Sequence, residues 1–205
     1  MKKGLILIGL TAVVVAVYFI FFSKSDDATP EAPKQQPLAQ SKNSDAFNKP
    51  FNDMLKSYFD LKDALVDWDT AKATASALKL IDLADKVPYD EIKADTTIIQ
   101  TAKSYSGSVI AEAKGIAGDP SIDEKRHSFY TLSENLFNLL RTVKYDQQVI
   151  YYDKCPMAFN ETEEGYWLTN SKDIVNPYLG NKHPKYHSGM VGCGSIEDSV
   201  SFTKQ

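Results

Sequence analysis

The residues best suited to chemistry gather in the last third of the chain and are rich in sulfur. Both cysteines of the 205-residue sequence and two of its four methionines lie there, in the motifs Cys155-Pro156-Met157 and Met190-Val191-Gly192-Cys193. Thiolate and thioether sulfurs are soft donors, which select Cu(I) over hard cations. If the two motifs face each other as stiff hairpins, Cys155, Met157, Met190 and Cys193 would present up to four sulfur ligands to a copper-type ion.

Two histidines between these motifs are candidate auxiliary ligands. His183 and His187 are four residues apart and could ligate Cu(II), Zn(II) or Ni(II). Pro184 and Gly189 argue against a helix in this stretch, so the spacing alone does not bring the two imidazoles together. The third histidine, His127, falls off the apolar stripe of a predicted helix, and we expect it to be solvated.

A structural disulfide is the alternative interpretation of the same two cysteines, because cysteines in exported domains very often pair. A Cys155–Cys193 bridge would close a loop of about 38 residues and stabilise the fold by about 3–4 kcal/mol on the loop-entropy estimate. The neighbouring methionines would then be packing residues, and a surface at Trp167 and Tyr178 would dock a partner. Spacing does not decide between metal site and disulfide, and reduction of a bridge could open the metal site.

The sequence lacks the motifs of common enzyme classes. It has no Cys-x-x-Cys of a thiol–disulfide oxidoreductase and no Gly-x-Gly-x-x-Gly or phosphate-binding loop. Cys193 and His187 are six residues apart, but no third group that would orient them is evident. A net charge of −4 without basic clusters argues against a nucleic-acid-binding surface. We therefore expect a binding protein rather than an enzyme.

The N-terminal region predicts export from the cytoplasm. Two lysines precede an uncharged apolar run, residues 4–22, which is long enough to cross a bilayer as a helix. The run ends in bulky aromatic residues rather than the small residues of a cleavage site, so residues 1–22 are interpreted as an uncleaved inner-membrane anchor in preference to a cleaved signal. Residues 23–43 predict a disordered tether to a periplasmic or otherwise extracytoplasmic domain, residues 44–205.

Four amphipathic segments predict helices in the body of that domain. Apolar residues recur at helical spacing from Phe47 to Leu65, from Ala73 to Val87, from Ile98 to Ala113 and from Phe129 to Val143. Pro50 suits the first turn of the first helix, and Asp69 or Thr70 could cap the second. Ser121 and Glu124 have the spacing of a capping box at the start of the fourth. Short connections between the four helices predict a mainly α fold, an antiparallel four-helix bundle.

The sequence changes character after Tyr145, where the helical pattern stops. Residues 148–152 have the composition of a β-strand. Glycine, proline and aromatic residues dominate from there on. We therefore expect residues 146–205 to form a small loop-rich lobe with short β-strands, packed on one end of the bundle.

A series of motifs resembles the domain-of-unknown-function family 3347. The motifs are Tyr151–Ala158 with its Cys-Pro-Met, Gly165-Tyr166-Trp167-Leu168, Asn176-Pro177-Tyr178-Leu179-Gly180 and Met190-Val191-Gly192-Cys193-Gly194. Two segments upstream, Tyr58–Leu65 and Arg126–Phe129, also resemble that family, so the resemblance spans residues 47–196.

The resemblance implies an exported protein that handles copper. Members are mostly from Bacteroidetes-type bacteria, and the domain also occurs fused to periplasmic adaptor subunits of copper and silver efflux pumps. By this resemblance Cys155, Met157, Met190 and Cys193 are the ligand positions, Cu(I) is the cofactor, and a periplasmic efflux adaptor or metallochaperone is the partner in heavy-metal resistance. Between the positions of Gly180 and Met190 the family usually has only one or two residues, so the longer segment 181–189 with both histidines is a local addition.

Overall fold

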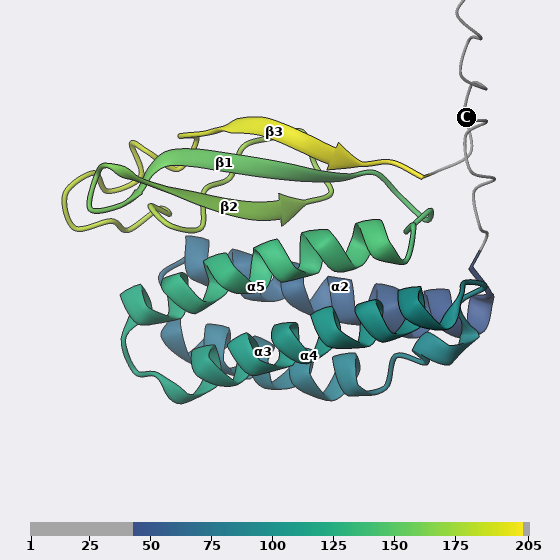
Figure 1. The fold of residues 1–205 in the computed structure, drawn as a ribbon. Coiled ribbons are helices and arrows are strands. Elements are labelled where there is room, and N and C mark those ends of the chain that lie inside the picture. The colour runs from purple at the N-terminus through teal and green to yellow at the C-terminus, as the bar shows by residue number, and fades with distance from the viewer. Residues whose placement is uncertain (1–42, 203–205) are drawn as a thin grey trace, which may run out of the picture. The chain divides into compact units, whose positions relative to one another are not determined.

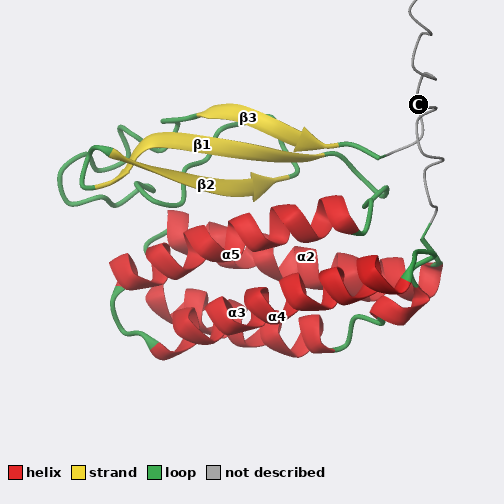
Figure 2. Cartoon of the chain, viewed as in Figure 1, coloured by secondary structure: helices red, strands yellow, loops and turns green. Residues whose placement is uncertain are grey.

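The computed structural model describes residues 43–202 and contains four α-helices followed by a three-stranded antiparallel sheet (Figures 1 and 2). The elements are α2 (Asp45–Val66), α3 (Thr70–Asp85), a 3₁₀ turn η1 (Tyr89–Glu91), α4 (Thr96–Gly118), α5 (Ile122–Thr142), β1 (Ile150–Phe159), β2 (Glu163–Thr169) and β3 (Ser195–Val200). The predicted anchor and nearly all of the predicted tether lie outside the described residues. Within residues 43–202, no helix is both long and apolar enough to cross a membrane.

All four predicted helices are present, and each begins at a polar side chain that caps it. The caps are Ser44 to the N–H of Phe47, Asp69 to Lys72, Asp95 to Ile98 and Ser121 to Glu124. Such side chains satisfy backbone donors that have no partner inside the helix. The predicted choice of Asp69 or Thr70 is resolved in favour of Asp69.

Two details of the predicted helix starts are wrong. Helix α2 begins at Asp45, so Pro50 lies inside the helix and not in its first turn. The capping box of α5 is only half formed, since the N–H of Ser121 donates to Asp119 Oδ1 at 2.8 Å. Asp119 thus takes the role that the sequence pattern assigns to Glu124.

Tyr58 of α2 joins three elements in the centre of the domain. Its hydroxyl lies 2.7 Å from Ser133 Oγ on α5 and accepts the backbone N–H of Leu168 on β2 at 2.9 Å. The Tyr58 ring stacks on Phe129 of α5 with centroids 5.2 Å apart. Because Ser133 donates its own proton to the carbonyl of Phe129, the Tyr58 hydroxyl is the donor to Ser133. Helices and sheet are therefore held in register by one buried, fully hydrogen-bonded phenol.

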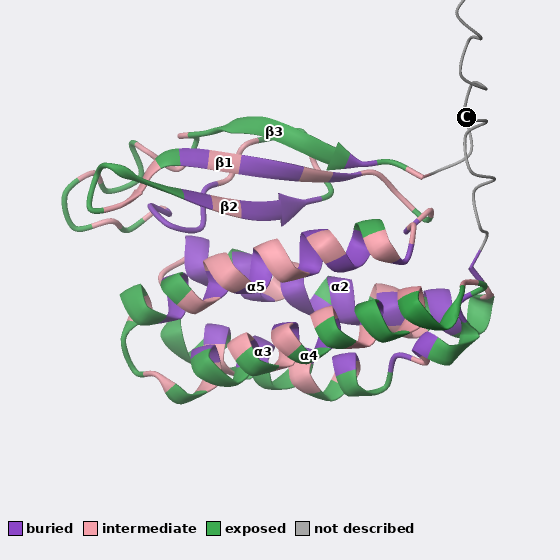
Figure 3. Ribbon diagram, in the orientation of Figure 1, coloured by how far each residue is buried: buried purple, intermediate pink, exposed green. Residues whose placement is uncertain are grey.

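The sheet has the order β2-β1-β3 and lies over α5 and α2, with α3 and α4 on the side away from it (Figure 1). Tyr152 of β1 stacks on Phe137 of α5 at 4.2 Å, and Tyr166 of β2 packs against Tyr130 of α5 at 6.1 Å. These contacts run along the helix, so the prediction that the lobe would sit on one end of the helices is wrong. Figure 3 shows buried residues in the first part of β1 and in the second part of β2, whereas β3 is exposed along most of its length.

The first sulfur motif lies inside a strand and not in the predicted hairpin. Strand β1 runs through Cys155, Pro156 and Met157, where a loop was expected. Its register with β2 is irregular between Cys155 and Phe159, and its pairing with β3 ends at Lys154. Proline cannot donate to a sheet ladder, so it is found at edges and bulges. Pro156 is tolerated in β1 because it falls where the ladder is already interrupted.

Replacing Tyr58 with Phe is expected to lower the free energy of unfolding by about 1–3 kcal/mol, because it leaves the buried N–H of Leu168 without an acceptor. Urea denaturation followed by circular dichroism measures this loss. Tyr105→Phe is the matched control, because the Tyr105 side chain on α4 is only half-buried, and it should lower the free energy of unfolding by less. Equal losses in the two variants would contradict the role assigned to Tyr58.

Candidate functional site

The structure brings the two predicted cysteines together. Cys155 Sγ and Cys193 Sγ lie 3.7 Å apart, although the residues are 38 positions apart in the chain. Cys155 is buried in the central strand β1, and Cys193 is partly exposed in the loop that leads into β3. A disulfide bond is only about 2.05 Å long, so both side chains here are free thiols.

Asn176 holds the loop that carries Cys193. Its buried side chain donates to the Cys193 carbonyl at 2.8 Å and accepts the N–H groups of Tyr178 and Leu179 at 2.8 and 3.0 Å. Its own N–H donates to the Val191 carbonyl at 2.8 Å. An asparagine before proline commonly organises a turn in this way. The sequence offered this signal in its Asn-Pro-Tyr motif, but our interpretation assigned Asn176 no role.

Burial governs the chemistry of Cys155. It raises the pKa of the thiol to about 11, while hydrogen bonds from the Met157 backbone and the Asn176 side chain act in the opposite direction. The neighbouring Cys193 thiol also raises this pKa. At neutral pH Cys155 is therefore a protonated thiol, and it becomes a good ligand only when a metal ion displaces the proton.

Asp153 is a buried acid two residues before Cys155 that sequence reasoning missed. Burial raises the pKa of its carboxyl to about 7, and the nearby Lys62 opposes this shift. Within residues 43–202 neither carboxylate oxygen has a hydrogen-bond partner. Trp167 is opposite Asp153 in the register of β1 and β2, and its indole N–H also lacks a partner there. The carboxyl holds a proton up to near-neutral pH, which limits the negative charge beside the thiols.

The two predicted methionines lie near the cysteines in the chain and are half-buried against the core. Met157 follows Cys155 on β1, and the Met190 carbonyl accepts the N–H of Cys193 at 2.9 Å in a tight turn. Within the part of the chain that the structure describes, no group of three or more Cys, His, Asp or Glu side chains could hold a metal ion.

The two histidines pair with each other through their backbones. The N–H of His187 donates to the His183 carbonyl at 2.8 Å, with the reverse bond at 3.3 Å. The His183 ring stacks on Tyr186 at 4.9 Å and meets the edge of Trp68 at 5.7 Å. Its Nδ1 accepts the N–H groups of Lys185 and Tyr186, both at 3.2 Å. His183 thus belongs to an aromatic cluster that includes Trp68, and His187 is exposed.

The predicted interaction surface at Trp167 and Tyr178 is wrong. Trp167 is 0% exposed and Tyr178 is 2% exposed. Their rings meet edge to face at 6.0 Å, and the Tyr178 hydroxyl donates to the Tyr166 carbonyl. Gly194, in the long connection between β2 and β3, lies against the Trp167 ring, because a Cβ at this position would be 3.0 Å from the indole. This connection folds back over the sheet and encloses the aromatic side chains.

Iodoacetamide is expected to alkylate Cys193 before Cys155 at pH 7.5 under reducing conditions, because Cys155 is buried and its thiol pKa is about 11. Peptide mass spectrometry at successive times gives the two rates. In urea the difference should disappear, which is the control for the influence of the fold. Faster labelling of Cys155 in the native protein would overturn this view of the thiol pair.

Comparison with known proteins bears on the helical part of the chain. No curated protein and no solved structure matches the chain. The family model described as "Protein of unknown function (DUF3347)" matches residues 54–148, from the middle of α2 to just before β1. The matched range includes α3, α4 and α5 and ends before both cysteines. Residues 54–148 are therefore similar to the family described as "Protein of unknown function (DUF3347)".

Proposed function

We propose that this protein binds a soft metal ion, Cu(I), outside the cytoplasm, and that Cys155 and Cys193 are its two thiolate ligands. The observation that carries the proposal is the 3.7 Å separation of their sulfur atoms. Two sulfurs that each lie about 2.3 Å from a shared tetrahedral ion are about 3.8 Å apart. The pair therefore has the spacing of a chelate with little movement, and thiolates are the ligands that Cu(I) prefers.

We assign Met157 and Met190 as the candidate thioether ligands that complete the site. Each is half-buried and close in sequence to one of the two cysteines, and thioether sulfur is also a soft donor. His183 and His187 are left out of this ligand set. The support for leaving them out is that His183 packs against Trp68 and Tyr186 and uses its Nδ1 as an acceptor of backbone N–H groups.

The setting of the site is part of the proposal. The apolar run at residues 4–22 would anchor the domain to the inner membrane, on its periplasmic side. The four helices, interpreted as an antiparallel bundle, would serve as the platform that holds the sheet. In this setting the domain would buffer copper or transfer it to a periplasmic efflux adaptor or metallochaperone, as the family resemblance implies.

A second candidate function is a structural or interaction domain in which the two cysteines form a disulfide. The same separation favours it, because the sulfur atoms need to approach by only about 1.7 Å to bond. The raised pKa of the buried Cys155 is also typical of a structural cysteine. The cysteines of the functional protein are reduced in the first candidate and are joined in a disulfide in the second.

Titration of the reduced protein with Cu(I) against a chromophoric chelator tests the first candidate. We expect one ion per chain, and affinity that falls at least about tenfold in Met157→Leu and in Met190→Leu. The near-isosteric change Met54→Leu, in the helical core, is the matched control and should leave affinity unchanged. Cys155→Ser and Cys193→Ser should each remove tight binding. No binding by the reduced protein, or equal binding by both serine variants and the parent, would leave the disulfide candidate.

The affinity for Cu(I) is expected to rise with pH. A thiol whose pKa is about 11 is protonated below that value, and each metal-bound thiolate releases one proton. Loss of the Cys155 proton alone should make the affinity about tenfold higher for each pH unit between about pH 6 and pH 9. Competition titrations at three pH values, corrected for the chelator's own protonation, measure this slope. An affinity independent of pH would show that Cys155 is not a ligand.

A further inference from the structure

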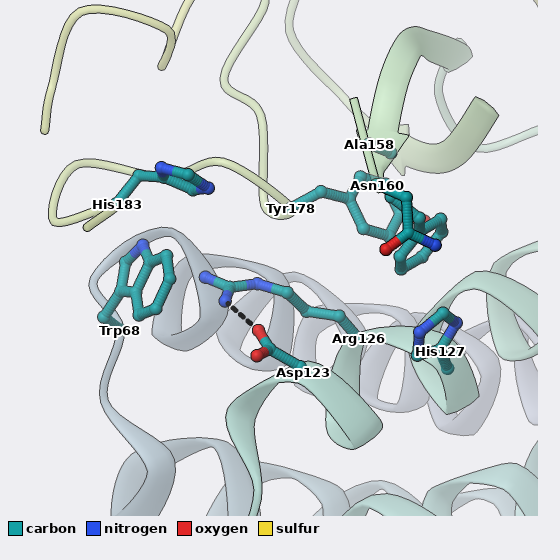
Figure 4. Close-up of a pocket in the computed structure, with 9 residues that line it drawn as sticks. Trp68, Asp123, Arg126, His127, Ala158, Asn160, Tyr178 and His183 are labelled. Carbon is teal, nitrogen blue, oxygen red and sulfur yellow. Dashed lines mark hydrogen bonds and ion pairs between the residues drawn. The ribbon is translucent and has the colours of Figure 1, made fainter. Parts of the chain in front are cut away.

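A cavity separate from the thiol pair opens between the helices and the C-terminal lobe (Figure 4). Its volume is about 240 Å³, which is room for a small ion and not only for one water molecule. Four segments line it: the turn after α2 with Trp68, the start of α5 with Asp123 and Arg126, the turn after β1 with Asn160, and the loop with His183. No short motif in the sequence indicates this cavity.

Arg126 places a buried positive charge in the wall of this cavity. It is 2% exposed, and its Nε and Nη2 donate to the carbonyls of Pro177 and Leu65 at 2.9 and 3.1 Å. Its Nη1 lies 3.5 Å from an oxygen of Asp123, whose side chain is 77% exposed. Burial lowers the pKa of the guanidinium to about 10, and Asp123 opposes this shift. A guanidinium carries five N–H groups, so two remain for a ligand.

Two more polar side chains that line the cavity can donate a hydrogen bond to a ligand. Since His183 Nδ1 accepts N–H groups from Lys185 and Tyr186, the neutral ring carries its proton on Nε2, which makes that atom a donor. Asn160 Nδ2 donates one of its two hydrogens to Glu163 Oε1 at 3.0 Å, so the other is left. Asp123 is the one carboxylate among the lining residues. Hydrogen-bond donors therefore dominate in the wall.

Two of the lining residues have a left-handed backbone conformation, which asparagine adopts readily and tryptophan does not. Trp68 has φ 58° and Asn160 has φ 50°, a left-handed conformation that is rare for a residue as bulky as tryptophan. Trp68 is held in it by a hydrogen bond from its indole N–H to the Leu179 carbonyl at 3.0 Å and by Arg126, whose guanidinium carbon lies 3.8 Å from the ring centroid. Strain of this kind persists only where the surroundings enforce it, and it gathers at binding sites.

We propose that this cavity binds a small oxyanion, a carboxylate or a phosphate, through the free N–H groups of Arg126 with help from His183 and Asn160. The planar guanidinium fork matches the oxygen atoms of such groups, and the bond is strongest where water is excluded. Figure 4 shows the guanidinium between the Trp68 ring and the Asp123 carboxylate, with His183 close by and Asn160 farther along the cavity. This site is independent of the thiol pair and of the proposed binding of copper.

Isothermal titration calorimetry of the full-length protein in non-ionic detergent tests the proposal, with inorganic phosphate and acetate as separate probes at constant ionic strength. Saturable binding of phosphate or of acetate is expected. The probe that binds more tightly shows whether the cavity prefers a phosphate or a carboxylate. If neither probe binds at concentrations up to about 50 mM, the dissociation constant is above that value and the proposal is overturned.

Two neighbouring glycine substitutions supply a matched comparison. Asn160→Gly removes an amide of the cavity, and glycine adopts positive φ without strain, so the variant should fold well. It should bind the anion about tenfold more weakly. Glu161→Gly changes the next residue, which has φ 63° and does not line the cavity, and it should bind within about twofold of the parent, since an exposed charge has little effect.

Arg126→Gln, checked for folding by circular dichroism, should abolish binding, because the amide lacks the charge and the fork of the guanidinium. If it does not fold, the glycine pair decides alone. Anion binding that Asn160→Gly leaves unchanged, or that both glycine variants weaken equally, would show that the anion binds elsewhere and would overturn the proposal.

Discussion

The arrangement of this domain depends on the contacts of one buried group, the guanidinium of Arg126. It extends from α5, stacks on Trp68, and donates to the carbonyl of Leu65 at the end of α2 and to that of Pro177 in the C-terminal lobe. The last carbonyls of a helix have no partner inside the helix, and here residues remote in sequence satisfy two of them. Arg126 takes the carbonyl of Leu65, and the N–H of Asn181 takes that of Val66 at 2.9 Å.

This docking explains why the loop near residue 180 cannot vary freely. Gly180 has φ 58°, and a Cβ at this position would lie 2.5 Å from the Val66 carbonyl oxygen and 2.7 Å from the Trp68 indole nitrogen. Only glycine allows that approach. The same loop contains Asn176, which holds the carbonyl of Cys193. The positions of the thiol pair and of the anion cavity are therefore set by one packed junction, although the two sites use different residues.

Local patterns in the sequence predicted what local forces determine. Periodicity and capping residues predicted all four helices, and the two cysteines singled out in the sequence have their sulfur atoms 3.7 Å apart. What failed depends on contacts between distant segments. Arg126 bonds to residues 51 and 61 positions away, a relation that no short motif encodes. Trp167 was expected at the surface because nothing in its neighbourhood indicates that the connection between β2 and β3 folds over it.

The strand order also fixes when the thiol pair can exist. Cys155 lies in the central strand, whereas Cys193 directly precedes β3, the last strand of the sheet. At a synthesis rate of about 5–20 residues per second, the 38 positions between them correspond to a delay of about 2–8 seconds. During that interval the nascent chain carries Cys155 without the thiol that lies beside it in the folded domain. Pairing of β3 with β1 is thus the step that brings the loop of Cys193 to Cys155 and completes the thiol pair.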